Sequence, residues 1–203
     1  MRAVFGLLSG ILPIIGAYPY IRDELRGKTK PHRMAEFIYA VLDSIAFASQ
    51  LAKGATWSVI LPGVGMVEML IGFLLSLKYG MGGTSKKDIA ALALSAAGLI
   101  LWYFTRQPLT ALFIVIGIDI ISTSLVVIKT YHHPHTETLS AWFMSFLAGL
   151  FAAAAVGYWS FTLQIYPLVV ALGNGAICAT ILLRRNKVPP NDMNTELHPG
   201  MMI

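Results

Sequence analysis

Seven apolar stretches fill most of this chain of 203 residues, and each is long enough to cross a membrane as a helix. Only 12% of the residues are charged, and most of these lie between the stretches. A soluble domain of this length does not carry so many apolar segments. The sequence therefore predicts an all-α membrane protein with seven transmembrane helices, expected at residues 3–21, 34–52, 57–77, 88–105, 108–128, 137–156 and 159–183.

Short polar segments break the apolar stretches for physical reasons. Gly27–Pro31 contains a glycine, a proline and two lysines, so it cannot continue an apolar helix. Gly80–Gly83 separates the third stretch from the fourth, and Ser85–Asp88 offers a capping box that would open the fourth helix. We expect one membrane domain over 1–187 and a disordered cytoplasmic tail over 188–203.

Basic residues are distributed unevenly between the two sides that seven crossings would create. The side of the C-terminal tail holds twelve Lys and Arg, whereas the side of the N-terminus holds three, which are Arg2, Lys53 and Arg106. Because cytoplasmic loops carry an excess of Lys and Arg, the sequence predicts an external N-terminus and a cytoplasmic C-terminus, and we expect the plasma (inner) membrane. The net charge of +5 comes from these helix ends, so no nucleic-acid partner is expected.

Landmarks recur in the same order along the two halves of the chain. Eight residues after Pro31 comes the aromatic Tyr39, and eight residues after Pro134 comes Trp142. Each half then contains a Trp-Ser pair followed by a membrane proline. These further landmarks are Trp57, Ser58 and Pro62 in the first half, and Trp159, Ser160 and Pro167 in the second. Their order predicts an internal repeat; chance similarity among apolar helices is the alternative.

The repeat predicts two parallel three-helix units joined by one linker helix, in a three-one-three (3+1+3) arrangement. Repeat one covers 1–80, the linker helix 81–106 and repeat two 107–187. A linker that crosses once lets both triplets run in the same direction, and we expect it to pack beside the first triplet. Parallel repeats are a transporter architecture in which substrate is held near the midplane, where the repeats meet.

The end of the first stretch carries Pro19–Ile21 followed by Lys28–Lys30. With the three-one-three layout and the external N-terminus, this segment resembles the SWEET and PQ-loop superfamily of seven-helix carriers, although Tyr20 stands where those proteins usually have Gln. The resemblance implies a carrier of sugars, amino acids, cystine or related small solutes. It also implies that Asn174 occupies the place of a substrate-pocket asparagine in repeat two, whereas repeat one has Gly72 at the aligned place.

Three acidic residues, Asp43, Glu68 and Asp119, lie near the middle of their stretches. An acid at that depth costs about 3 kcal/mol or more unless it is paired, protonated or hydrated. Their common depth predicts a midplane site for a cation, a proton or a polar solute, with the side chains facing one central cavity rather than lipid. The alternative is that protonated acids form hydrogen bonds between helices and only hold the bundle together.

Asn174, Tyr39 and Trp142 complete the predicted substrate-binding set. Asn174 lies between two glycines, which let other groups approach the backbone, and a link between helices is its equal alternative. Tyr39 shares a helix face with Asp43, four residues away, and Glu36 joins that face. For Trp142, packing or a place at the membrane interface is favoured over a role as a pocket wall.

No metal, cofactor or catalytic site is expected. The loop histidines His132, His133 and His135 lack the spacing of a closed metal site, and no hydrolase or metalloenzyme motif occurs. We expect a carrier, not an enzyme, that moves a small polar solute (sugar, amino acid or similar) by alternating access, with proton coupling left open. The alternative is a non-transporting ligand-binding or sorting receptor on the same scaffold, similar to the KDEL-receptor relatives of these carriers. The expected partners are the solute and the lipid bilayer, and formation of a homo-oligomer is left open.

Overall fold

The computed structural model describes residues 1–52, 57, 60–83, 85–105, 108–157 and 161–189. These residues form seven α-helices and one short 3₁₀ helix, and their only strand-like pairing is an isolated bridge between His32 and Met81. The helices are α1 (Arg2–Leu25), α2 (Arg33–Ala52), α3 (Ile60–Tyr79), α4 (Lys86–Thr105), α5 (Pro108–His132), η1 (Pro134–Thr136), α6 (Leu139–Ala155) and α7 (Phe161–Arg185). The predicted all-α class is confirmed over the described part of the chain.

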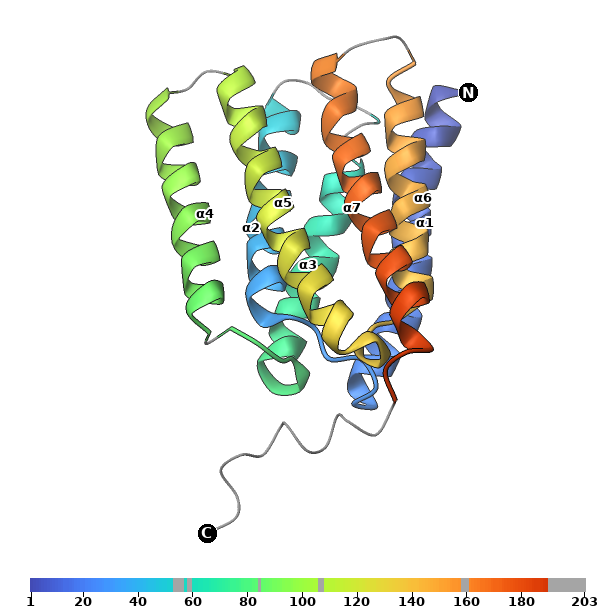
Figure 1. Cartoon of the computed structure of the whole chain (residues 1–203). Coiled ribbons are helices and arrows are strands. Elements are labelled where there is room, and N and C mark those ends of the chain that lie inside the picture. The colour runs from blue at the N-terminus through green and yellow to red at the C-terminus, as the bar shows by residue number, and fades with distance from the viewer. Residues whose placement is uncertain (53–56, 58–59, 84, 106–107, 158–160, 190–203) are drawn as a thin grey trace.

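The helices run alternately down and up through one bundle (Figure 1). Helices α1, α3, α5 and α7 end at the bottom of the figure, and α2, α4 and α6 begin there; we call this the lower end of the bundle. The first break lies in the expected segment. Helix α1 ends after Leu25, and Gly27 adopts a positive φ of 69° while its N–H donates to the carbonyl of Glu24. A left-handed residue stops a helix, and glycine adopts that conformation at the lowest cost.

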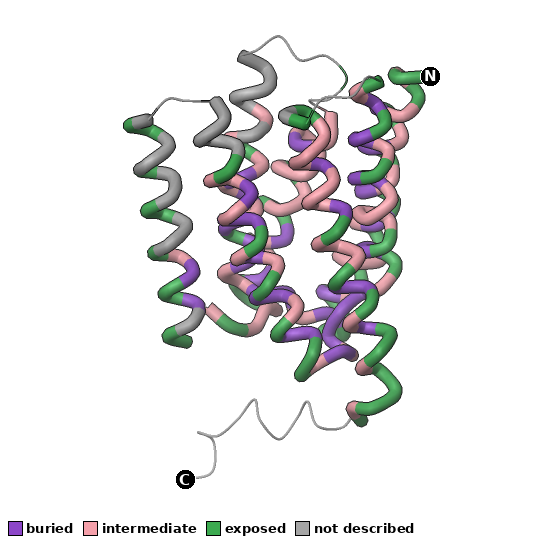
Figure 2. Tube along the Cα trace, turned by 45° about the horizontal axis from the view of Figure 1, so that its top comes forward, coloured by how far each residue is buried: buried purple, intermediate pink, exposed green. Residues whose placement is uncertain are grey.

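Four of the helices are long and apolar enough to cross a membrane. Their spans in the described residues are Arg2–Leu25, Ile60–Tyr79, Phe113–His132 and Leu163–Arg185. Large apolar side chains such as Leu74, Leu172 and Leu183 are exposed. Exposed positions, green in Figure 2, recur along the helices of the bundle. Apolar surface of this extent fits contact with lipid, so the membrane class is supported, while the seven predicted crossings stay a prediction.

Helices α1, α2 and α3 form one group of three, helices α5, α6 and α7 form another, and both groups have the same order of neighbours. Helix α3 lies between α1 and α2, and α7 lies between α5 and α6. The two groups meet where α1 packs along α6 and where α2 packs against α5. Every long helix except α4 therefore borders the space in the middle of the bundle.

Helix α4 stands at the outside of the bundle, and its position differs from the expectation. We expected the linker helix beside the first triplet, but α4 packs mainly against α5 and makes fewer contacts with α2 (Figure 1). Its tie to the first triplet is local and lies at the lower end. There His32, just before α2, contacts Asp88 in the first turn of α4 at 3.1 Å.

Small residues allow α6 to approach its neighbours closely. Ala148, Ala152 and Ala153 are buried on this helix. A methyl group added at Gly149 would lie 2.8 Å from the carbonyl oxygen of Pro167 and 2.9 Å from the backbone nitrogen of Ala171. In the absence of a hydrophobic force between helices in lipid, such close backbone contact is a main source of helix association.

Several residues of the predicted repeat and topology lie outside the described residues. They are Lys53, Ser58, Arg106, Trp159, Ser160 and the tail from residue 190 onward.

Candidate functional site

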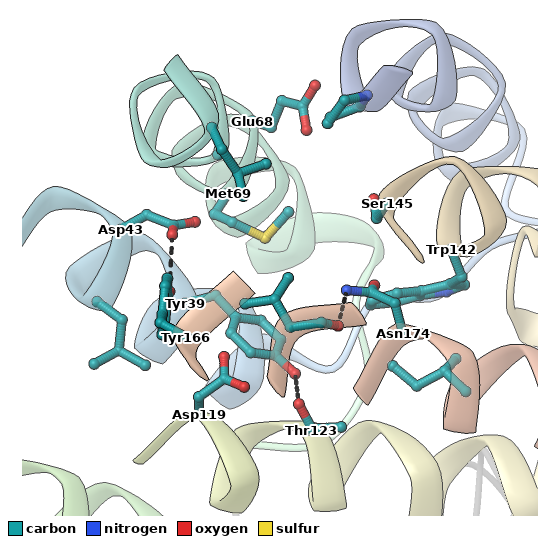
Figure 3. A pocket seen from close by; sticks show the side chains of 16 residues that line it. Tyr39, Asp43, Glu68, Met69, Asp119, Thr123, Trp142, Ser145, Tyr166 and Asn174 are labelled. Carbon is teal, nitrogen blue, oxygen red and sulfur yellow. Dashed lines mark hydrogen bonds between the residues drawn. The ribbon is translucent and has the colours of Figure 1, made fainter. Parts of the chain in front are cut away.

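All six residues of the predicted substrate-binding set line one cavity in the middle of the bundle (Figure 3). The cavity has a volume of about 100 Å³ and is bordered by side chains of α1, α2, α3, α5, α6 and α7. The predicted residues among them are Tyr39, Asp43, Glu68, Asp119, Trp142 and Asn174. The three acids thus border a common space, as expected from their common depth; that they bind a substrate stays a prediction.

Asp43 reaches the cavity from α2 and contacts two other helices. The hydroxyl of Tyr166 on α7 donates a hydrogen bond of 3.4 Å to Oδ1 of Asp43. On α3, a methyl group added at Gly65 would lie 2.5 Å from Oδ2 of Asp43. A side chain at residue 65 would therefore displace the carboxyl group, so glycine at this place keeps the group in its position.

Asp119 reaches the cavity from α5 and is 6% exposed. One turn farther along the same helix, Thr123 forms a hydrogen bond of 2.8 Å with the hydroxyl of Tyr39 on α2. This bond fixes the phenol beside the carboxyl group (Figure 3). Asp119 and Tyr39 therefore face the cavity together at the contact between the two triplets.

Glu68 approaches the cavity from α3, on the side opposite Asp119 (Figure 3). Its Oε1 is buried and has no hydrogen-bond partner among the described residues. A buried polar atom that is left without a partner costs about 1–3 kcal/mol, and more when it is charged. This oxygen therefore needs a proton, a water molecule or a bound group that the cavity itself supplies.

Asn174 and Trp142 both line the cavity, and their hydrogen bonds differ in kind. The side-chain amide of Asn174 donates to the carbonyl of Val170 in its own helix at 2.8 Å, so this donor does not link two helices. Trp142 belongs to the buried core and also lines the cavity. It therefore both packs in the core and borders the cavity, and its Nε1 donates a hydrogen bond of 2.7 Å to Oε2 of Glu137.

Sequence reasoning missed three polar residues of the cavity wall, Tyr166, Thr123 and Ser145. A signal for Tyr166 was present, because it precedes Val170 by four residues and Asn174 by eight, a spacing that places all three on one helix face. Thr123 likewise follows Asp119 by four residues. Ser145 follows Trp142 by three residues, a spacing that also places two residues on one helix face.

The cavity wall carries acids and hydroxyl groups but no fixed positive charge. None of the described residues that line it is Lys, Arg or His. The described residues also include no group of three or more His, Cys, Asp or Glu side chains placed to hold a metal ion. The arrangement can therefore bind protons, water or a small solute that donates hydrogen bonds, and it disfavours anions.

Comparison with models of protein families, with characterised proteins and with solved structures found no match to this chain.

Proposed function

We propose that this protein is a membrane carrier that moves a small polar solute by alternating access, and that the solute carries an amine or another cationic group. The observation that carries the proposal is the buried Oε1 of Glu68, which has no partner among the described residues and borders a cavity shared with Asp43 and Asp119. Three carboxyl groups without a basic residue in the wall create an environment that an ammonium group or protons would neutralise.

The size of the cavity favours a small solute. Pockets for drug-sized ligands measure roughly 300–1,000 Å³, whereas this one measures about 100 Å³. A few water molecules or a compact amine fit such a space. A sugar or a larger amino acid requires the helices to move apart, which a carrier does when it exposes its site to one side.

The architecture proposed for the carrier is the parallel repeat. Its support is the equivalent order of neighbours, in which α3 separates α1 from α2 and α7 separates α5 from α6. The acids lie where the two triplets meet, as in carriers built from repeats. The same layout is one of the features in which the sequence resembles the SWEET and PQ-loop carriers.

The proposed orientation places the lower end of the bundle in the cytoplasm of a plasma (inner) membrane. The support is the excess of Lys and Arg in the segments that connect the helices at that end. A reporter that is active only in the cytoplasm should work when it is fused after Lys187. A reporter that is active only outside should fail there, and the reverse result would contradict the orientation and the crossing number together.

The test has two stages and uses the purified full chain. A thermal-shift screen compares small amines, cationic amino acids, neutral amino acids and sugars at a mildly acidic and a mildly alkaline pH. The stabilising compound is then offered to proteoliposomes that contain the wild type, Glu68→Gln, Asp119→Asn or the control Asp23→Asn. Asp23 is a matched acid outside the cavity wall, paired with Arg22 at 3.1 Å.

We expect uptake to fall at least about tenfold in the two cavity variants, equivalent to ~1.4 kcal/mol, and to persist in the control. If the acids only hold helices together, both cavity variants should transport like the wild type and lose at most about 1 kcal/mol of stability. Binding of the solute without uptake in any preparation would instead favour the receptor that the sequence leaves as an alternative.

A further inference from the structure

A second cluster of acids lies at the lower end of the bundle, outside the cavity. It consists of Glu24 near the end of α1, Glu36 in the first turn of α2 and Glu137 just before α6, with Lys129 of α5 among them. All four side chains are buried, with exposed fractions of 0–6%. Glu36 is therefore buried, although it lies near the end of its helix.

One of the three carboxyl groups is fully paired. Glu137 forms an ion pair with Lys129 through Oε1 and accepts the N–H of Trp142 through Oε2. Lys129 also donates to the carbonyl of Lys30 at 2.7 Å. The only basic side chain of the cluster is thus already used by Glu137, and it neutralises a single acid.

The other two carboxyl groups are not satisfied. Glu36 accepts the hydroxyl of Tyr20 at 3.0 Å on Oε1, but its Oε2 is buried without a partner in the described chain. Glu24 is 0% exposed, and neither of its oxygens has a partner there. The charges that act on Glu24 through space are Glu36 and Glu137, which repel it, and Lys129, which attracts it.

Two unpaired carboxylates cannot both stay ionised in such a place. A buried charge without a partner costs far more than a buried neutral group, and the usual outcome is that it takes up a proton. A metal ion is the other way to neutralise the charge, but the described residues contain no group of acids placed to ligate one. A protonated carboxyl group needs no additional space and provides an O–H donor to a neighbouring oxygen.

We propose that Glu24 and Glu36 form a proton-binding site at the lower end of the bundle, separate from the central cavity. The proton comes from water at this end, forms an O–H bond on a carboxyl oxygen of the pair and returns to water when it is released. While it is bound, it removes the electrostatic repulsion between the carboxylates of Glu24 and Glu36. The site does not rest on transport, because its evidence is the unpartnered oxygens of buried acids.

The groups that set the proton balance come from every element around the pair. Tyr20 contributes its hydroxyl from α1, Lys129 its ammonium from α5, and Glu137 its carboxylate from the segment before α6. Tyr20 also lies edge-on against Trp142, with ring centres 6.2 Å apart. Because Trp142 lines the cavity as well, a change in the pair can reach the central site through this one ring.

Infrared difference spectroscopy of the full chain in lipid bilayers tests the site. Spectra are recorded from mildly acidic to mildly alkaline pH for the wild type, Glu24→Gln, Glu36→Gln and the control Asp23→Asn. Asp23 adjoins Glu24 in the sequence, but it is paired with Arg22 and partly exposed. We expect a carboxylic acid C=O band that titrates in the wild type and in the control, and that loses intensity in both Gln variants.

A substitution can also alter the spectrum by changing the structure, so the melting temperature is measured over the same pH range as a second test. If the folded protein holds protons that the unfolded chain releases, its melting temperature falls as pH rises. This fall should be smaller in Glu24→Gln and Glu36→Gln, since glutamine stays neutral. A band that does not titrate, or a titrating band and a melting profile that are unchanged in both variants, would overturn the proposal. Neither result depends on uptake, so it is independent of the test for a carrier.

Discussion

The indole N–H of Trp142 on α6 donates a hydrogen bond of 2.7 Å to Glu137, which lies five residues earlier and before the helix begins. The ring itself lines the central cavity. A single side chain therefore borders the cavity with its ring and holds the acidic cluster of the lower end with its nitrogen. The ring and the nitrogen of one rigid side chain therefore connect the two polar regions.

Replacing Trp142 by Phe tests this connection. Phenylalanine keeps an aromatic ring but has no N–H, so Oε2 of Glu137 loses its donor in a buried place. We expect a loss of about 1–3 kcal/mol in the free energy of unfolding. Unfolding in detergent micelles measures it. Trp57→Phe is the control, because Trp57 is 45% exposed and should tolerate the change. Equal stabilities of the two variants would contradict the role of this bond.

Gly65→Ala should disturb the cavity without removing an acid. The added methyl group would lie 2.5 Å from Oδ2 of Asp43 and must push the carboxyl group aside. Gly117→Ala is the matched control, since the same methyl group on α5 meets nothing within 4 Å. We expect the stabilisation by a bound solute in the thermal-shift assay to decrease in Gly65→Ala and to persist in Gly117→Ala. The same response in both variants would argue against Asp43 as part of the site.

The local features of the fold could be predicted from the sequence because their causes are local. Apolar length defines the helices, and Gly27 ends α1 through its own backbone conformation. It was also predictable that Asp43, Glu68 and Asp119 would border one cavity. Depth along a helix can be counted, and lipid disfavours acids that face outward. These inferences need no knowledge of how the helices pack.

Features that depend on packing could not be predicted in this way. The neighbours of α4 follow from contacts among seven helices, and sequence order alone suggested the wrong partner. Glu24 and Glu137 did not stand out in the sequence, because charges near a predicted interface usually reach water. Their burial arises where the segment between α1 and α2 contacts the segment between α5 and α6, as in the hydrogen bond of 3.0 Å from the N–H of Lys30 to the carbonyl of Thr136. No local pattern in the sequence records this contact.

Gly149→Ala tests the close packing of α6. The added methyl group would approach the backbone of α7 at 2.8 Å and 2.9 Å, and the backbone cannot move aside as a flexible side chain can. Overpacking of this kind typically costs about 1–3 kcal/mol, whereas an unobstructed Gly→Ala change within a helix gains up to about 1 kcal/mol. We therefore expect Gly149→Ala to melt at a lower temperature than Gly117→Ala. The opposite order would show that α6 and α7 are packed less closely.

The lower end also contains a contact that should depend on pH. His32 lies just before α2, where Nε2 contacts Asp88 at 3.1 Å and Nδ1 accepts the N–H of Ala35 at 3.4 Å. Because Nδ1 is an acceptor, the ring is neutral with its proton on Nε2. Burial lowers the pKa of His32 below its usual 6.5; Asp88 opposes this effect and Lys129 adds to it. The hydrogen bonds and the pKa thus agree on a neutral ring.

Acid should therefore destabilise the protein through His32. Below the usual pKa of 6.5 the unfolded chain takes up a proton on this ring, while the folded protein takes it up only at lower pH. Stability is thus lost as pH falls from that value and levels off once the folded form is protonated, by about 1.4 kcal/mol for each unit between the two pKa values. His32→Gln keeps an N–H donor for Asp88 and does not titrate. The difference in melting temperature between the wild type and this variant should be constant at alkaline pH and should shift in favour of the variant in acid. A difference that is independent of pH would show that His32 binds its proton equally well in both states.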